Sequence, residues 1–466
     1  MTSRSERLQL ARGQRRHRVR LGANSAIATV VVGALLLAGS AGSWSGKHRK
    51  RRFVQTTVTA TATLAPTTTE APTTTDAPTT TDAPTTTDAP TTTDAPTTTD
   101  APTTTDAPTI TTPSTPSATD AATPQGPCAG VPMLRGQADI DAAPPGTPFC
   151  LSGTHNWTLT PKAGDTLRGP ATLDGQNSTS HAIVAVAPSV TLQDLTIQHY
   201  NNGDQDAPIA VDDNTAAPGW HLNNLDVGFN SDAGTRLGDG WVLTGGRYHD
   251  NGQEGIQGGG RPNNVTLDGV ELDHNDFTDS SYTTRNVSCG YEAGGAKFVA
   301  SNVTVENSYI HDNACKGIWT DINTSGITII NNRVANNWDE GIFIEISSNA
   351  TITGNTVTGN GKHNYNGGGS GCPWLFGGGI TLNSSDHATI SGNGLSGNCN
   401  GITLIQQDRP DGSPGLLQNV TVDGNTVSGS GVVGAAEDNG ADLTRRNIVF
   451  SANTFANGQV FCGLAC

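Results

Sequence analysis

A short unit is written twice between Gly317 and Glu345, and this repetition constrains the fold more than any other feature. Residues 317–322 (GIWTDI) return 24 residues later as residues 341–346 (GIFIEI). Steps of 21 to 24 residues separate the other repeats wherever no insertion interrupts them. Such a period is typical of chains that stack similar units, each too small to bury its apolar face alone.

Within each repeat, apolar and polar residues alternate as in short strands that are buried on one side. The apolar positions recur one unit later, as in Val303, Val305, Ile310 and then Ile327, Ile329, Val334. Asparagine recurs five residues after the strand start, at Asn332, Asn355, Asn393, Asn425 and Asn453. It also recurs ten residues after that start, at Asn230, Asn251, Asn275, Asn313, Asn337, Asn360 and Asn398. Asparagine tolerates the left-handed backbone of a corner and can hydrogen-bond along a stack of its own kind. We therefore predict an all-β parallel solenoid with a continuous apolar interior.

Charge is unevenly distributed along the 466 residues, and the distribution excludes one class of partner. From Gln125 onward there are 14 Lys or Arg against 33 Asp or Glu, whereas residues 1–55 carry twelve bases and one acid. An acidic main domain disfavours nucleic acid as a partner. It is compatible with Ca²⁺ and with neutral or cationic ligands.

The N-terminal quarter predicts export and display rather than a packed domain. Residues 1–22 are basic, and residues 23–45 are apolar enough for either a cleaved signal peptide or a signal-anchor helix. Residues 46–124 form a Thr/Asp/Ala/Pro stalk with TTTDAP repeats, in which regular proline blocks helix and sheet. We expect residues 125–466 to form the solenoid, held outside the cell or on the outer face of its membrane.

All eight cysteines follow residue 127, and none forms a Cys-x-x-Cys pair, so disulfides are favoured over zinc. Equivalent positions on neighbouring rungs lie about 4.8 Å apart, within reach of a disulfide. This spacing predicts Cys289–Cys315 and Cys372–Cys399 as links between rungs. We also predict Cys128–Cys150 at the N-terminal cap and Cys462–Cys466 at the C-terminal end.

Several motifs give the chain a family resemblance over residues 145–460. They are PKAGDT (161–166) with LDG (173–175), NGQEGI (251–256), EAGGAKF (292–298), GIWTDIN (317–323) and GIFIEIS (341–347). The chain resembles exported right-handed parallel β-helix repeat proteins (PbH1-type repeats), the class that includes pectate lyases, polygalacturonases and alginate epimerases. The resemblance implies a right-handed solenoid of about ten rungs and a carbohydrate-active protein, without specifying the reaction.

Aligning the Gly-Ile strands gathers chemically useful side chains on one outer surface. Successive strands should direct Lys297, Trp319, Asp321, Phe343, Glu345 and Asn383 outward. Exposed aromatic rings stack on sugar rings, and neighbouring carboxylates can act as acid and base. We assign Asp321, Glu345 and Lys297 as catalytic residues. Substrate binding is assigned to Trp319, Phe343, Asn383, Glu292, Arg409 and Trp374.

Three interpretations of this surface stay open from the sequence. The carboxylates can catalyse retaining or inverting hydrolysis, or Asp321 and Glu345 can hold Ca²⁺ while Lys297 is the base of a β-elimination. Alternatively, both carboxylates form a structural salt bridge with Lys297. We predict an exported monomer that binds and cleaves or modifies a polysaccharide, with a non-catalytic adhesin or glycan-binding module as the alternative.

Overall fold

The computed structural model describes residues 128–203, 205–211, 216–275, 293–362, 372, 374–407, 415–437, 443–456 and 459–464. Regular structure in these ranges is almost entirely strand, with one α-helix, α2 (Gln137–Ala142), and one 3-10 turn, η1 (Leu443–Arg445). None of the helical structure in these ranges is long and apolar enough to cross a membrane. The segments predicted for residues 1–22, 23–45 and 46–124 lie outside the described residues.

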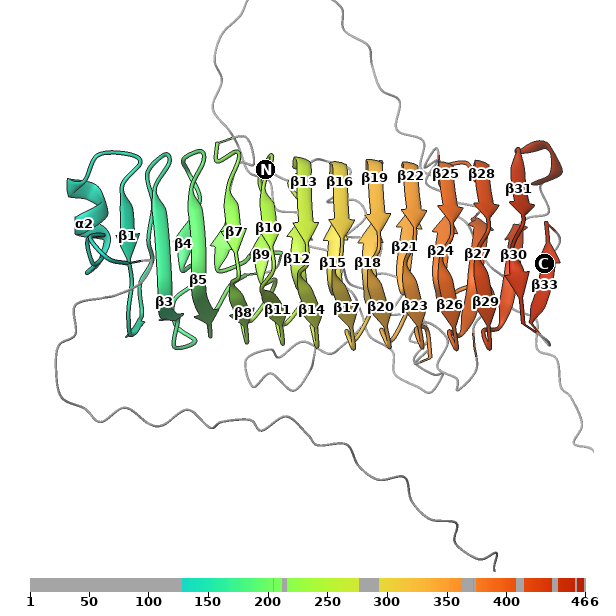
Figure 1. The fold of residues 1–466 in the computed structure, drawn as a ribbon, viewed down its shortest axis with the longest axis horizontal. Coiled ribbons are helices and arrows are strands. Elements are labelled where there is room, and N and C mark those ends of the chain that lie inside the picture. Colours follow the sequence, from blue (N-terminus) through green and yellow to red (C-terminus); the bar gives the residue numbers. More distant parts are fainter. Residues whose placement is uncertain are drawn as a thin grey trace, which may run out of the picture. The chain divides into compact units, whose positions relative to one another are not determined.

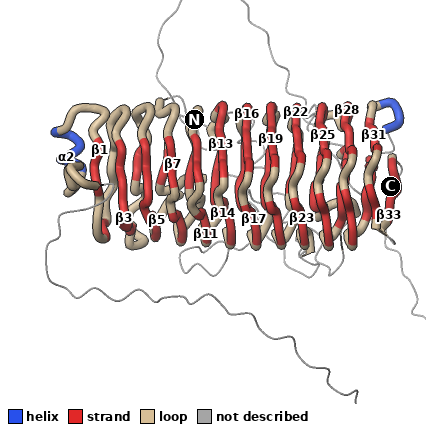
Figure 2. Tube along the Cα trace, in the orientation of Figure 1, coloured by secondary structure: helices blue, strands red, loops and turns tan. Residues whose placement is uncertain are grey.

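The strands wind into a parallel β-helix, seen side-on in Figures 1 and 2. One sheet has eleven strands, which are β4 (Ile183–Val184), β6 (Ile209–Ala210), β9 (Thr235–Arg236), β12 (Glu254–Gly258), β15 (Gly294–Phe298), β18 (Lys316–Thr320), β21 (Ile342–Glu345), β24 (Gly378–Asn383), β27 (Asn400–Gln406), β30 (Val432–Glu437) and β33 (Val460–Gly463). We call it the eleven-stranded sheet. Every pairing within it is parallel, between one rung and the next.

The other 22 strands form two series that the long strands β3 and β5 join into one sheet. The first series is β1 (Pro148–Cys150), β3 (Thr166–Asp174), β5 (Thr191–Gln198), β7 (His221–Asn223), β10 (Val242–Thr244), β13 (Asn263–Asp268), β16 (Ser301–Glu306), β19 (Ser325–Ile330), β22 (Ser348–Thr353), β25 (Asp386–Ser391), β28 (Gln418–Asp423) and β31 (Ile448–Ser451). The second is β2 (Thr154–His155), β8 (Asp226–Gly228), β11 (Arg247–His249), β14 (Glu271–Asp273), β17 (Tyr309–His311), β20 (Arg333–Ala335), β23 (Thr356–Thr358), β26 (Gly394–Ser396), β29 (Thr426–Ser428) and β32 (Thr454–Phe455). The predicted all-β parallel β-helix is therefore confirmed.

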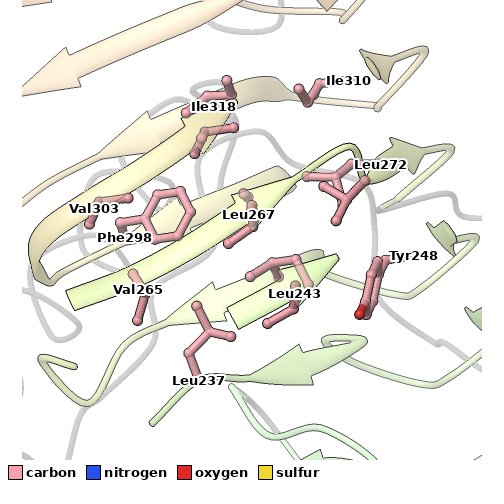
Figure 3. Packing of buried hydrophobic residues seen from close by; sticks show 14 of the residues in the cluster. Leu237, Leu243, Tyr248, Val265, Leu267, Leu272, Phe298, Val303, Ile310 and Ile318 are labelled. Carbon is pink, nitrogen blue, oxygen red and sulfur yellow. The ribbon is translucent and has the colours of Figure 1, made fainter. Parts of the chain in front are cut away.

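The interior is one continuous column of apolar side chains, part of which Figure 3 shows. In the first series Val265 pairs with Val303, and Val303 pairs with Ile327 on the next rung. In the eleven-stranded sheet, Ile318 pairs with Ile342 in the same way. All these residues are buried. Because like residues stack on like, each rung provides the surface that its neighbour needs to bury its own apolar face.

The two predicted asparagine series form hydrogen-bonded ladders inside the corners. Asn313 Nδ2 donates to Asn337 Oδ1 at 2.8 Å, and Asn337 Nδ2 donates to Asn360 Oδ1 at 2.9 Å. The second ladder runs in the same way from Asn332 to Asn453 through the members between them. One detail of the prediction is wrong: the residue before each ladder asparagine takes the left-handed backbone, as Asn331 and Asn336 do. The ladder side chain thereby turns inward, where the stack replaces water as its hydrogen-bond partner.

Disulfides secure the fold where they were predicted. Cys128–Cys150 and Cys372–Cys399 are bonded, with Cα–Cα distances of 5.8 and 5.3 Å. Cys315 and Cys462 are disulfide-bonded as well, and their expected partners, Cys289 and Cys466, lie outside the described residues. Disulfides of this kind are typical of proteins that fold outside the reducing cytosol.

Candidate functional site

The outer side of the eleven-stranded sheet carries a row of larger side chains, one on each rung. The strand register aligns Gln257, Lys297, Trp319, Phe343, Thr381 and Thr403. Ile344, one residue beyond Phe343, belongs to the interior column. The predicted inward and outward directions along these strands are therefore confirmed.

Burial corrects one expectation about this row. Trp319 and Phe343 were expected to be exposed aromatic rings, but they are only 9% and 4% exposed. Two ammonium groups lie over them: Lys297 Nζ is 3.7 Å from the centroid of the Trp319 ring, and Lys316 Nζ is 4.9 Å from it. Lys316 Nζ is also 5.3 Å from the centroid of the Phe343 ring. The rings therefore stabilise buried cations through their negative faces rather than forming an open stacking platform.

The two predicted carboxylates each have a partner of their own. Lys297 Nζ lies 3.1 Å from Asp321 Oδ2, and both side chains are almost fully buried. The backbone N–H of Ile322 donates to Asp321 Oδ1 at 2.7 Å. Glu345 is half-buried, and the Trp319 indole N–H donates to its Oε2 at 3.1 Å. The ion pair that was one interpretation of the sequence is thus present at Asp321. Binding of Ca²⁺ by Asp321 and Glu345 stays a prediction.

A second group of buried charges beside the aromatic rings was missed by the sequence analysis. Lys316 Nζ lies 2.8 Å from Asp339 Oδ2 and 3.7 Å from Glu340 Oε2. The backbone N–H of Gly377 donates to Glu340 Oε1 at 3.0 Å. All three charged side chains are at least nine-tenths buried. A signal was available, since Lys316 is one of only four lysines after Gln125.

Burial and mutual charge set unusual proton affinities in this group. Burial, together with the Asp339 carboxylate, raises the pKa of Glu340 to about 8. Burial alone would lower the pKa of Lys316, but the Asp339 and Glu340 carboxylates raise it above its usual value. Burial likewise opposes ionisation of Asp339, yet the Lys316 ammonium keeps the pKa of Asp339 below its ordinary value. The pair Asp339 and Glu340 therefore holds one proton at neutral pH, and Glu340 carries it.

Polar atoms without protein partners lie at the N-terminal end of the row. Gln257 pairs in register with Lys297, and its amide oxygen is buried with no hydrogen bond to the described residues. Neither amide atom of Gln253, which is 1% exposed, has such a partner either. Buried amides in folded proteins are normally satisfied, by protein, water or ligand. These two buried amides therefore have hydrogen-bonding capacity that the described residues do not fill.

The remaining predicted binding residues are dispersed. Asn383 is buried, and its Nδ2 donates to Gln407 Oε1 at 2.8 Å, so its amide is hydrogen-bonded to a residue of the neighbouring rung. Trp374 is 48% exposed. It therefore offers the exposed aromatic ring that was expected at Trp319 and Phe343. Glu292 and Arg409 lie outside the described residues. A polar hollow of about 160 Å³ lies just past the ends of β18, β21 and β24, and its lining includes Asn323, Ser347, Ser384, Asp386 and Gln418.

Comparison with known proteins agrees with this architecture. Residues 209–375 match the model of the family described as right handed beta helix region. A search of curated protein sequences gives no match. Among solved structures, the A-module of the Azotobacter vinelandii mannuronan C-5 epimerase AlgE6 is similar, with 13% identity, coverage of 67% of this chain and 81% of that one, and a TM-score of 0.41.

The catalytic unit of the thermostable GH87 alpha-1,3-glucanase from Streptomyces thermodiastaticus strain HF3-3 is also similar. It has 17% identity, coverage of 74% of this chain and 70% of that one, and a TM-score of 0.47. At such low identity the likeness is one of fold and does not carry over a reaction. The resemblance inferred from the repeated motifs is confirmed: residues 209–375 match the right handed beta helix region model, and the parallel β-helix continues on both sides of them.

Proposed function

We propose that this protein is a carbohydrate-active enzyme that cleaves or epimerises a polysaccharide on the outer side of its eleven-stranded sheet. The observation that carries the proposal is the buried charge on that side. Two lysines lie over Trp319 there, and three buried acids, Asp321, Asp339 and Glu340, lie against these lysines. Burying charge is unfavourable even when it is paired, and perturbed buried acids concentrate at sites of chemistry.

The proposed division of roles follows from solvent access and protonation. Glu345 is the carboxylate of the site with partial access, and the Trp319 indole N–H stabilises its ionised form, which accepts a proton or attacks carbon. Glu340 is 1% exposed, so it acts through Lys316 and Asp339 as a positioning residue rather than by touching the substrate. The buried ion pair of Lys297 and Asp321 places one positive and one negative charge in the same site. Asn383, Glu292 and Arg409 remain proposed binding residues, and the exposed Trp374 is suited to stacking on a sugar ring.

Glu345→Gln tests the proposal in the full chain. We expect turnover to fall by at least about a hundredfold, because the amide neither accepts a proton nor attacks. The substrates are a panel of uronate and neutral polysaccharides, assayed with and without EDTA for reducing ends, unsaturated products and changed sugar configuration. Glu306→Gln is the matched control, since Glu306 is a half-buried glutamate on the outer side of β16. Equal turnover by Glu345→Gln and the wild type would overturn the role of Glu345.

A glycan-binding module without catalysis is the second candidate, and a specific observation favours it. Lys297 is paired with Asp321 and Lys316 with Asp339, and buried ion pairs of this kind also occur in purely structural networks. This alternative predicts that the panel yields no product while binding of a glycan persists in Glu345→Gln. Export through residues 23–45, display on the stalk of residues 46–124, and a monomeric state belong to both proposals.

A further inference from the structure

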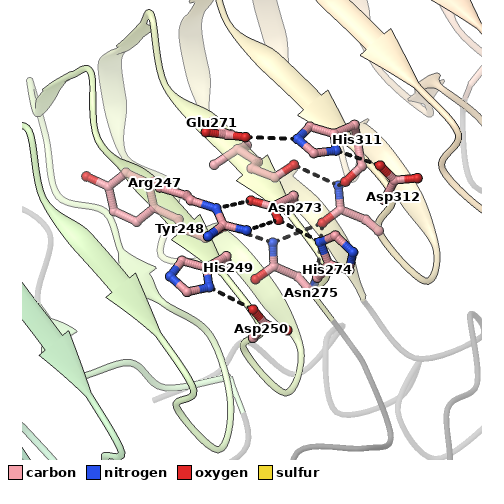
Figure 4. A network of polar contacts seen from close by, with 12 residues as sticks. Arg247, Tyr248, His249, Asp250, Glu271, Asp273, His274, Asn275, His311 and Asp312 are labelled. Carbon is pink, nitrogen blue, oxygen red and sulfur yellow. Dashed lines mark hydrogen bonds and ion pairs between the residues drawn. The ribbon is translucent and has the colours of Figure 1, made fainter. Parts of the chain in front are cut away.

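A second polar cluster lies away from the eleven-stranded sheet, on the outer side of β11, β14 and β17 (Figure 4). The register aligns His249, Asp273 and His311 on three consecutive rungs. Glu271 stands two residues before Asp273, on the same side of β14. Parallel stacking therefore brings two imidazoles and two carboxylates together from segments more than twenty residues apart.

Each member of this cluster is held in place by a second contact. His311 Nδ1 lies 2.7 Å from Asp312 Oδ2, and His311 Nε2 lies 3.1 Å from Glu271 Oε1. Asp273 is fully buried and accepts from Arg247 Nε at 2.8 Å. Its second oxygen accepts from Arg247 Nη2 at 2.5 Å, and His274 Nδ1 lies 2.6 Å away. The Tyr309 ring stacks on the His311 imidazole with centroids 3.8 Å apart.

The cluster has an excess of negative charge. Five carboxylates contact His249, His311 or Arg247 in the described part of this network; they are Asp226, Asp250, Glu271, Asp273 and Asp312. Burial alone would lower the pKa of His249, but the Asp226 and Asp250 carboxylates raise it to about 9, so His249 is cationic at neutral pH. Arg247 and His249 together offset two of the five negative charges. A divalent cation would offset more of that charge where the carboxylates converge.

We propose that Glu271, Asp273 and His311 form a binding site for a divalent transition-metal ion of the Zn²⁺ type. One ligand atom from each of the three side chains lies within 4.8 Å of the others. Two carboxylates and one imidazole suit such an ion, whereas Ca²⁺ prefers a shell made only of oxygens. The site lies on a different sheet from the proposed glycan site and does not depend on that function.

The outer contacts match those that orient metal ligands in proteins. A carboxylate on Nδ1, here Asp312, fixes the tautomer of a ligating histidine and directs the Nε2 lone pair to the ion. Arg247 and His274 hold the Asp273 carboxylate in one orientation, and its Oδ1, which accepts from Arg247 Nε, retains capacity for a further partner. The Glu271 side chain is 42% exposed, so an ion can enter from its side of the cluster.

Calorimetric titration of the chelator-stripped full chain with Zn²⁺ tests this site. We expect one ion per chain at micromolar or tighter affinity, and a rise in Tm on adding Zn²⁺. Glu271→Gln and His311→Gln should each weaken binding at least about a hundredfold, and Asp312→Asn about 10- to 100-fold. Ca²⁺ at the same concentration should neither bind nor raise the Tm.

His387→Gln is the matched control, because His387 also contacts a neighbouring carboxylate, that of Asp386, on the outside of a strand. It should bind Zn²⁺ like the wild type. Unchanged affinity in both Glu271→Gln and His311→Gln, or no saturable binding by the wild type, would overturn the site. Because Glu271 is partly exposed, Glu271→Gln keeps the test valid even if His311→Gln folds poorly.

Discussion

At the scale of single residues, Glu340 makes the protein's stability depend on pH in an unusual direction. Its pKa is about 8 in the folded protein, against an ordinary value of 4.5. The folded state therefore holds this proton more tightly than the unfolded state. The resulting stabilisation is complete below pH 4.5 and disappears as the pH rises through about 8.

We predict that Glu340→Gln removes this contribution. Wild-type stability should fall between pH 5.5 and pH 8.5 by an amount on the order of a few kcal/mol. His249, with a pKa of about 9 against an ordinary 6.5, contributes to the slope above about pH 6.5. The variant should therefore lose most of the slope below that pH and part of it above. Urea unfolding of both proteins at several pH values measures the difference. Glu306→Gln should keep the wild-type slope. A slope equally steep in Glu340→Gln would show that another group binds the proton.

The site also shows what a repeat can predict about single residues. The alternation of apolar and polar residues along the strands correctly predicts that Lys297 and Trp319 point outward and that Ile344 points inward. It missed Lys316 and Glu340, which lie directly before the glycine that begins each Gly-Ile unit, where no outward row was expected. Burial of Trp319 was missed because a repeat predicts the direction of a side chain but not what covers it.

At the scale of elements, the glycines of the Gly-Ile strands are required by the asparagine ladder. A Cβ atom on Gly317, in β18, would lie 2.8 Å from Asn337 Nδ2 and 2.5 Å from the carbonyl oxygen of Gly341. Both neighbours are fixed by hydrogen bonds between rungs. The repeated Gly and Asn positions in the sequence therefore reflect a single packing requirement.

We predict that Gly317→Ala destabilises the protein by about 1–3 kcal/mol or more, because neither the ladder nor the next strand can move away. Gly394→Ala is the matched control: Gly394 also lies in a strand, β26, but nothing lies within 4 Å of a Cβ placed there. That change should leave stability unchanged or raise it slightly. Denaturant unfolding measures both variants. Equal effects would mean that the ladder yields to the extra methyl group.

At the scale of the whole β-helix, the two ends are covered by different structures. At the N-terminal end, α2 buries Ile140 against the first rungs, and Cys128–Cys150 closes the cap. At the C-terminal end, β33 carries the disulfide-bonded Cys462, and among the described strands it pairs only with β30. Val460 and Phe461 there are 54% and 47% exposed. A terminal rung has only one neighbour, so its stability depends on whatever caps it.

This difference predicts unequal opening of the two ends. In hydrogen exchange on the full chain, we expect the amides of β33 and β31 to exchange at least about a hundredfold faster than those of β19 and β22. Opening the last rung breaks contacts with one neighbour, whereas opening a central rung breaks contacts with two. Amides of β1 should stay protected until Cys128–Cys150 is reduced, and reduction should then raise their exchange. Equal protection at both ends before reduction would contradict this account, because helix and disulfide would then contribute nothing to the stability of the first rung.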